Sequence, residues 1–145
     1  MDNTEDLRLL REGAVKLKID VADDSLRPLL WLKDELLRWN RKVNLTASVE
    51  RSEVLEKHFL DSLAVLPELG HAESLLDIGA GAGFPGLPLK LARPELNLTL
   101  VESSAKKVAF LKHAIASLKL NATRAVHARA SGDPHSPWHI ADGWR

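Results

Sequence analysis

The sequence contains no cysteine, which excludes disulfide bridges, thiolate metal sites and cysteine nucleophiles. It has no apolar run approaching the ~20 residues of a membrane-spanning helix. The stretch from Met1 to Arg11 is charged and lacks the apolar core of a signal peptide. Net charge is also absent, because 20 Lys and Arg balance 20 Asp and Glu among 145 residues. A neutral chain is not a polycation that coats nucleic acid. We therefore expect a soluble, cytoplasmic protein with no membrane segment.

Hydrophobic residues make up 45% of the chain and charged residues 28%, which is the composition of a globular protein. The length suits one domain, or one domain with a helical extension. Apolar residues at helical spacing predict helices at about 5–17, 26–39 and 52–66. We expect Pro28 in the first turn of the second helix and Pro67 at the end of the third. The first half of the chain is therefore predicted to be helical.

The third predicted helix carries His58, Asp61 and Ser62 near one face, and these are the residue types of a hydrolase triad. Such a triad needs its serine on a strained turn beside an oxyanion hole, usually with partners from separate segments. One turn of one helix does not provide that geometry. We interpret the three residues as a polar helix edge that meets another segment.

A strand, a glycine loop and a helix are predicted at the start of the second half. The short apolar run Ser74–Ile78 predicts the strand, and Gly79–Gly86 predicts the loop. Glycines allow a tight turn and let a ligand approach bare backbone, and the next helix points its N-terminal amides at the loop. A second strand, Leu96–Glu102, ends in an acid 23 residues after the first loop glycine. An acid in this position accepts hydrogen bonds from ribose hydroxyls.

The remaining elements are a helix at about 105–119 and a weak third strand at about 123–128. Residues 131–145 show no apolar period and are expected to be irregular. This tail holds His135 and His139, but Pro137 between them argues against a helical metal pair. No metal site is expected.

The glycine loop fits two patterns. Its second half, Gly81–Gly86, fits the dinucleotide fingerprint G-x-G-x-x-G. With the preceding acid it reads Asp77-x-Gly79-x-Gly81-x-Gly83, the nucleoside-binding turn of S-adenosylmethionine-dependent methyltransferases. A dinucleotide-binding strand normally stays apolar up to the turn, whereas an acid suits a ligand with a cationic amino acid end. Asp77 therefore favours S-adenosylmethionine, and a nicotinamide-dependent oxidoreductase remains the weaker alternative.

The stretch Leu76–Leu89 resembles the signature of one family, the bacterial 16S ribosomal RNA guanine-N7 methyltransferases, also called glucose-inhibited division protein B. Trp39–Thr46 resembles the family's W-N-x-x-x-N-L-T segment, and His58–Leu63 its H-x-x-D-S segment. Ser103–Leu111 resembles the stretch after the second strand. Together the matches cover roughly residues 25–130.

The resemblance implies an α/β fold, with an N-terminal helical extension followed by a truncated Rossmann-like S-adenosylmethionine methyltransferase sheet. The expected organisation is a helical region at 1–70, the first half of the Rossmann-like domain at 71–130, and the tail. The implied substrate is N7 of a guanine in 16S rRNA, within the small ribosomal subunit, and no obligate protein partner is expected. Because N7 has a free lone pair and no proton, no catalytic base is required and none is assigned.

The turn pattern and the resemblance together give a set of candidate cofactor-binding residues. They are Asp77, Gly79, Gly81, Gly83, Phe84, Glu102, Ala130, Ser131 and Arg145. Family members commonly have an acid where Ser131 stands. Candidate RNA-binding groups are Lys57, Lys106, Lys107 and Arg129.

The chain supplies three strands by Ala130, whereas the resemblance implies a sheet of seven. The sequence therefore predicts a C-terminally truncated copy, in which one strand is left with an unpaired edge. Such a chain is expected to transfer methyl groups poorly or not at all. An inactive remnant that at most binds the cofactor is the alternative to an active methyltransferase.

Overall fold

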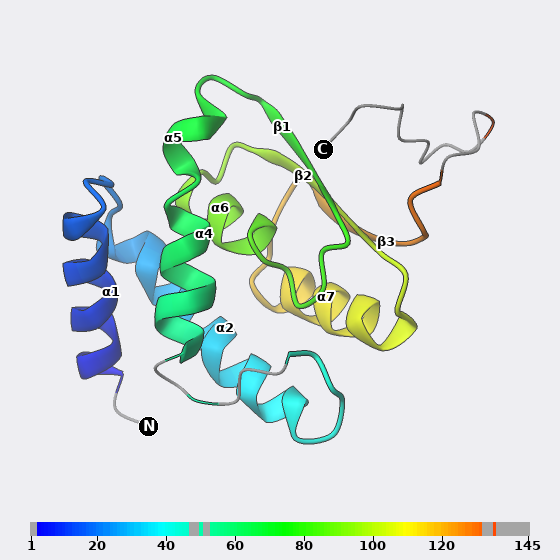
Figure 1. Ribbon diagram of the computed structural model, residues 1–145, viewed down its shortest axis with the longest axis horizontal. Coiled ribbons are helices and arrows are strands. Elements are labelled where there is room, and N and C mark those ends of the chain that lie inside the picture. The colour runs from blue at the N-terminus through cyan, green and yellow to red at the C-terminus, as the bar shows by residue number, and fades with distance from the viewer. Residues whose placement is uncertain (1–2, 47–49, 51–52, 132–134, 136–145) are drawn as a thin grey trace.

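The computed structural model describes residues 3–46, 50, 53–131 and 135 (Figure 1). Helices occupy the first half and a helix-covered sheet the second. In chain order the elements are α1 (Thr4–Lys16), α2 (Asp23–Asn40), the π-helix η1 (Val54–Leu60), α4 (Asp61–Leu63), α5 (Leu66–Leu69), β1 (Ser74–Ile78), α6 (Gly86–Ala92), β2 (Asn97–Glu102), α7 (Ala105–Ser117) and β3 (Thr123–His127).

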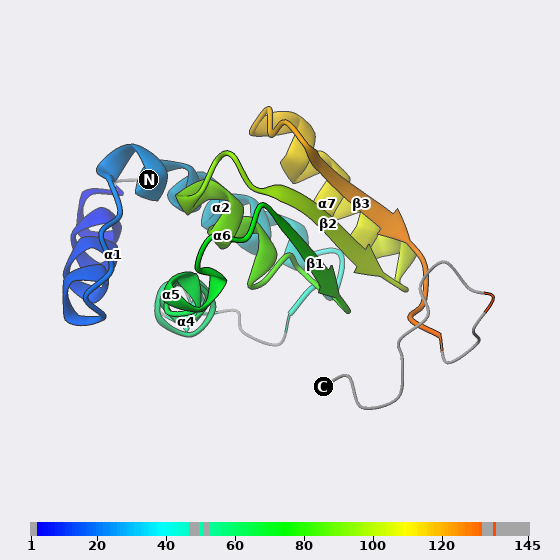
Figure 2. The same ribbon diagram turned by 90° about the horizontal axis from the view of Figure 1, so that it is seen from above.

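The three strands form one parallel sheet in the order β1-β2-β3. Parallel neighbours need crossover connections, and α6 and α7 provide them. Figures 1 and 2 show both helices on the same side of the sheet, and both contact β2. The α/β fold with N-terminal helices and a Rossmann-like parallel sheet is therefore confirmed. The carboxyl ends of all three strands lie along one edge, so the loops that follow them share that edge.

One hydrophobic core joins the helices to the sheet. It forms because the apolar stripes of the helices and the inward positions of β2 face each other. Helix α2 packs against α6, which in turn packs against β1 and β2. Representative fully buried members are Leu10, Leu36, Phe59, Leu87, Leu100 and Phe110. The boundary expected near residue 70 stays a prediction.

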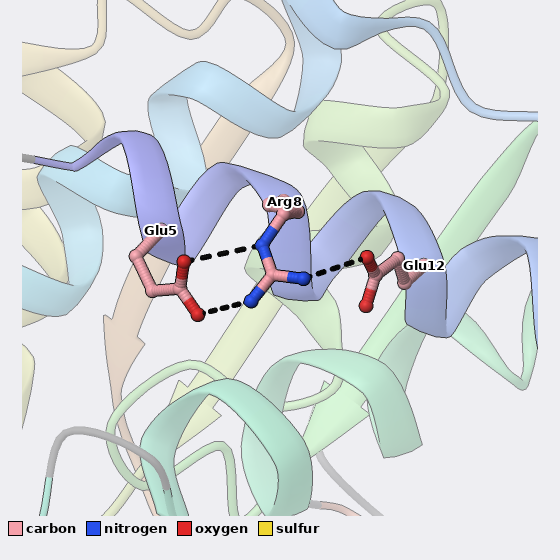
Figure 3. A network of polar contacts seen from close by, with 3 residues as sticks. All are labelled: Glu5, Arg8 and Glu12. Carbon is pink, nitrogen blue, oxygen red and sulfur yellow. Dashed lines mark hydrogen bonds and ion pairs between the residues drawn. The ribbon is translucent and has the colours of Figure 1, made fainter.

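Helix α1 has two contrasting faces. On the inner face, buried Asp6 pairs with the ammonium of Lys33, a fully buried residue of α2. On the outer face, Arg8 lies between Glu5 and Glu12 and donates to both carboxylates (Figure 3). The Arg8 Nη1 to Glu12 Oε1 distance is 3.0 Å. Helix α1 is thus attached to α2 by a buried ion pair and carries an exposed one on its solvent side.

The predicted strands and the helix after β2 are confirmed, and the hydroxyl of Ser104 caps α7 by accepting from the amide of Lys107. Two proline expectations are wrong. Helix α2 begins at Asp23, so Pro28 lies inside it. The carbonyl that this proline leaves without a partner belongs to the exposed Asp24, where water can satisfy it.

The third predicted helix ends at Leu63, earlier than the expected end near residue 66. It runs as η1 and α4, and α5 follows after two turn residues. Pro67 lies in the first turn of α5 instead of ending a helix, a position that needs no amide hydrogen. In the described part of the chain, no helix is long and apolar enough to cross a bilayer.

Candidate functional site

The glycine loop after β1 turns back over the end of β2. The amides of Gly79 and Ala80 both donate to the carbonyl of Val101, at 2.8 and 3.0 Å. Gly79 and Gly81 have φ values of +71° and +59°, which disfavour other residues. A side chain added at either position would meet no heavy atom within 4 Å. The loop therefore presents bare backbone toward open space.

Gly83 has a different role in the same loop. Its φ is +99°, and an added Cβ would lie 2.4 Å from Cδ1 of Leu87. The position is thus required for packing of the loop against α6. Of the three alternate glycines in the predicted turn, Gly79 and Gly81 leave space for a ligand, whereas Gly83 fixes the loop.

Asp77 lies on β1 and faces the start of α6. Its Oδ2 accepts a hydrogen bond from the amide of Gly86 at 3.1 Å. Burial raises the pKa of this carboxyl to about 6, and the Gly86 bond only partly opposes the shift. One of the N-terminal amides of α6 is therefore bonded to Asp77.

Glu102 ends β2 and is buried beneath the loop. One carboxylate oxygen accepts from the amide of Gly81 at 3.0 Å, and the other accepts from the amide of Ser104 at 2.5 Å. The acid therefore fixes both the glycine loop and the start of α7. An ionised carboxylate has about four acceptor positions, so two remain in addition to these bonds.

Phe84 lies at the edge of the core and stacks on His58, with ring centroids 4.8 Å apart and planes 13° apart. Nε2 of His58 is 3.3 Å from the hydroxyl of Thr46. Burial, followed by the charge of Lys57, lowers the pKa of His58. Phe59 also meets Phe84, with ring centroids 5.5 Å apart, so the helical region contacts the glycine loop through two aromatic pairs.

This contact agrees with the interpretation of His58, Asp61 and Ser62 as a polar edge that meets another segment. The Ser62 hydroxyl donates to the backbone carbonyl of His58, and Asp61 is exposed, so the three do not form a triad. The particular partners of His58 were not predicted. The only sequence signal for them was the occurrence of Thr46, His58 and Phe84 in three separate motif segments.

The remaining candidate cofactor-binding residues follow β3. Ala130 and Ser131 are half-buried just beyond β3, at the edge where the loop lies. The amide of Ala128 donates to the carbonyl of Glu102 at 3.1 Å, which joins that segment to the end of β2. Arg145 and His139 lie outside the described residues.

The predicted RNA-binding side chains come from three different elements. Lys57, Lys106 and Arg129 are exposed, on η1, on α7 and after β3, whereas Lys107 is half-buried. A cavity of about 350 Å³ opens elsewhere, at the end of α2, and Arg38, Trp39, Arg41, Lys42 and Val43 line it. Residue spacing does not predict this cavity, because its lining depends on the turn after α2.

A parallel sheet with a glycine loop after its first strand and an acid at the tip of its second is the layout of Rossmann-like nucleoside-binding domains. Residues 26–141 match the family model described as rRNA small subunit methyltransferase G. The chain belongs to that family.

Three relatives carry the name ribosomal RNA small subunit methyltransferase G. The chain is 58% identical to the protein of Myxococcus xanthus over 94% of its own length and 63% of the relative's. It is 50% identical to that of an Anaeromyxobacter species, over 86% of the chain and 58% of the relative. It is 45% identical to that of Alkaliphilus oremlandii, over 84% and 52%. The chain thus spans somewhat more than half the length of these relatives.

Proposed function

We propose that this chain carries the S-adenosylmethionine-binding part of a methyltransferase that acts on N7 of a guanine in 16S rRNA. Asp77 carries the argument. Its carboxyl is partly buried, has a raised pKa and has no cationic partner in the described chain, and it lies beside a loop whose backbone faces open space. Groups held in such a costly state occur preferentially at functional sites. Family membership supports the reaction and the substrate.

The residues present fit the proposed cofactor. Gly79 and Gly81 offer backbone that a nucleoside can approach closely, because no side chain or neighbouring atom occupies the space above them. The buried Glu102 retains acceptor positions for the ribose hydroxyls. Asp77 offers a negative charge to the amino acid end. When bound, S-adenosylmethionine supplies a methyl group on a positively charged sulfur.

The chain's own residues act by positioning. Guanine N7 has a free lone pair, so no side chain must remove a proton, and catalysis depends on alignment of donor and acceptor. Glu102 and Ser104 fix the loop relative to α7, and Phe84 fixes it relative to η1. Once methylated, the guanine carries the positive charge that the sulfur loses. We propose that the nearby carboxylates moderate this shift of charge.

Three residues after β3 complete the proposed site. Ala130 and Ser131 follow the strand at the edge that the glycine loop shares, which suits contact with the adenine. Arg145 is proposed from the family resemblance alone. We propose no metal-binding residue, since direct transfer of a methyl group to N7 needs no metal ion.

Calorimetry with S-adenosylhomocysteine tests the cofactor assignment. We expect the chain to bind S-adenosylhomocysteine and to bind no nicotinamide dinucleotide. The reverse result would overturn the assignment and favour the oxidoreductase alternative. The variant Glu102→Gln should lose most of the affinity for S-adenosylhomocysteine. Its matched control is Glu95→Gln, at an exposed position away from the loop, which should bind normally.

Transfer of labelled methyl groups to small ribosomal subunits tests the reaction. Label recovered as 7-methylguanine in 16S rRNA supports the full proposal. Binding of S-adenosylhomocysteine without transfer supports the alternative, a cofactor-binding module that lacks turnover. The two assays together therefore separate the two functions.

A further inference from the structure

The cavity at the end of α2 combines an apolar wall with positive charge. Its volume is about 350 Å³, and its lining includes the half-buried Trp39 and Val43. The other lining residues are Arg38, Arg41 and Lys42, and none is acidic. A cavity of this size is in the range of small-ligand sites. The combination suits a flat, apolar ring that is attached to a negative group.

Of the three positive side chains that line the cavity, one is paired with a carboxylate in the described chain and two are not. Nη2 of Arg38 lies 2.7 Å from Glu35, which holds the pKa of that carboxyl down at about 2. Arg41 and Lys42 are exposed, and within the described ranges neither pairs with an acid. These two cations are therefore free to meet an anion from solution.

The aromatic wall is rigid. Trp39 stacks on His113 of α7, with centroids 5.2 Å apart, and meets Phe110 edge-on at 5.5 Å. His113 is in turn held by Glu35, with Nε2 to Oε2 at 2.6 Å. A preformed aromatic surface binds a planar partner with little loss of conformational entropy.

The cavity is also connected to the glycine loop. Oδ1 of Asn40 accepts from the amides of Leu45 and Thr46, at 2.8 and 3.0 Å, and folds the turn back onto α2. Thr46 contacts His58, which stacks on Phe84 of the loop. The turn that lines the cavity is therefore joined to the glycine loop by a continuous chain of contacts.

We propose that this surface, Arg38–Val43, binds single-stranded RNA next to the methylation site. One unpaired base enters the cavity against Trp39 and Val43, and the flanking phosphates contact Arg41 and Lys42. Aromatic stacking with adjacent cations is the usual means of binding single strands without sequence preference. This inference rests on the proposed function and adds the place where its substrate is held. It places RNA on α2 rather than on the lysines of η1 and α7.

The test measures the affinity for a fluorescein-labelled oligoadenylate by anisotropy over a range of salt concentrations. Each phosphate contact on a single strand contributes about 0.7 to the slope of log K against log salt. The double variant R41Q/K42Q should therefore reduce the slope by about 1.4. The matched control K16Q/R27Q removes two exposed charges, one at the end of α1 and one near the start of α2, and should leave the slope unchanged.

An abasic oligonucleotide of the same length separates the cavity from the cations. Loss of the stacked base should weaken binding about tenfold, whereas R41Q/K42Q should keep that preference for bases. Thermal unfolding of each variant checks that the fold is intact.

Equal slopes in R41Q/K42Q and K16Q/R27Q would overturn the surface and leave the proposed function intact. Equal affinity for the abasic strand, or for polyglutamate, would overturn the cavity as a base site. Absence of any RNA binding by the unaltered chain would also overturn the surface, and S-adenosylhomocysteine calorimetry would then judge the proposed function separately.

Discussion

Two carboxylates, the fully buried Asp6 of the helical region and the partly buried Asp77 beside the glycine loop, are stabilised differently. Asp6 of α1 is fully buried and pairs with the equally buried Lys33, whose ammonium also contacts Asn3 at 3.0 Å and Asp34 at 3.1 Å. Asp77 has a neutral backbone amide as its partner. The first charge is balanced and holds two helices together. The second is unbalanced and weakens the fold beside the proposed site.

The contrast distinguishes a structural charge from a functional one. A buried ion pair requires both members, because removal of either leaves the other uncompensated. A partly buried carboxylate without a cationic partner, such as Asp77, destabilises the folded state when it is ionised, as its raised pKa indicates. A gain in stability on removal of the Asp77 charge, with a loss of ligand binding, is the signature of a functional group.

The largest expected effect is in the helical region. Lys33→Met should lower the free energy of unfolding by about 3–5 kcal/mol, because it leaves Asp6 buried without its cation. Chemical denaturation measured by circular dichroism gives the value. The double variant Asp6→Leu with Lys33→Met should recover much of the loss. If the double variant is as unstable as the single one, the pair does not act as a unit.

The next largest effect is a gain in stability, expected on removal of the Asp77 charge. Asp77→Asn keeps an oxygen for the Gly86 amide and removes the charge, so at pH 8 it should raise stability by about 1–3 kcal/mol. It should also weaken S-adenosylhomocysteine binding. Asp20→Asn, an exposed change, is the control for both measurements. A destabilised Asp77→Asn variant with normal binding would show that Asp77 is a structural charge and not a functional one.

The pH profile follows from the same group. The folded-state pKa of Asp77, about 6, is raised above its ordinary 3.8. Its contribution to stability is therefore fully present below about pH 4 and is lost as pH rises through 6. We expect the stability difference between Asp77→Asn and the unaltered chain to grow over that interval. A difference that stays constant from pH 4 to 8 would show that the carboxyl titrates normally.

A smaller pH effect is expected at His58, where stability is lost as pH falls instead of as pH rises. Burial lowers its pKa below the ordinary 6.5, so its contribution is present above pH 6.5 and is lost as pH falls through the folded-state pKa. His58→Phe retains a ring against Phe84 and should remove this acid sensitivity. Denaturation midpoints at pH 7 and pH 5 measure it. His71→Gln, at an exposed position, should retain the sensitivity of the unaltered chain.

The smallest effect is expected on the outer face of α1. Arg8→Gln removes the network with Glu5 and Glu12 shown in Figure 3, and the denaturation midpoint should not change measurably. Exposed ion pairs contribute little because water and salt screen them. A clear loss of stability would mean that charge pairing on α1 matters on both faces, not only at Lys33.

Local patterns explain most of what the sequence predicted correctly. Strand β2 has an alternating apolar pattern, and α7 has an apolar stripe with a serine before it. The glycine spacing defined the loop, and the acid ending β2 was found by its distance from Gly79. The errors at Pro28 and Pro67 concern element boundaries, since α2 begins at Asp23 and Pro67 lies in the first turn of α5.

The sequence by itself determined the α/β order, the glycine loop and the acid at the end of β2, since each depends on residues within one short segment. Only the tertiary structure decided that Asp77 is partly buried, that His58 stacks on Phe84 and that Trp39 forms a cavity wall against His113. These features arise from contacts between segments far apart in the chain. Burial and pairing are properties of the assembled core, and no local spacing of residue types specifies them.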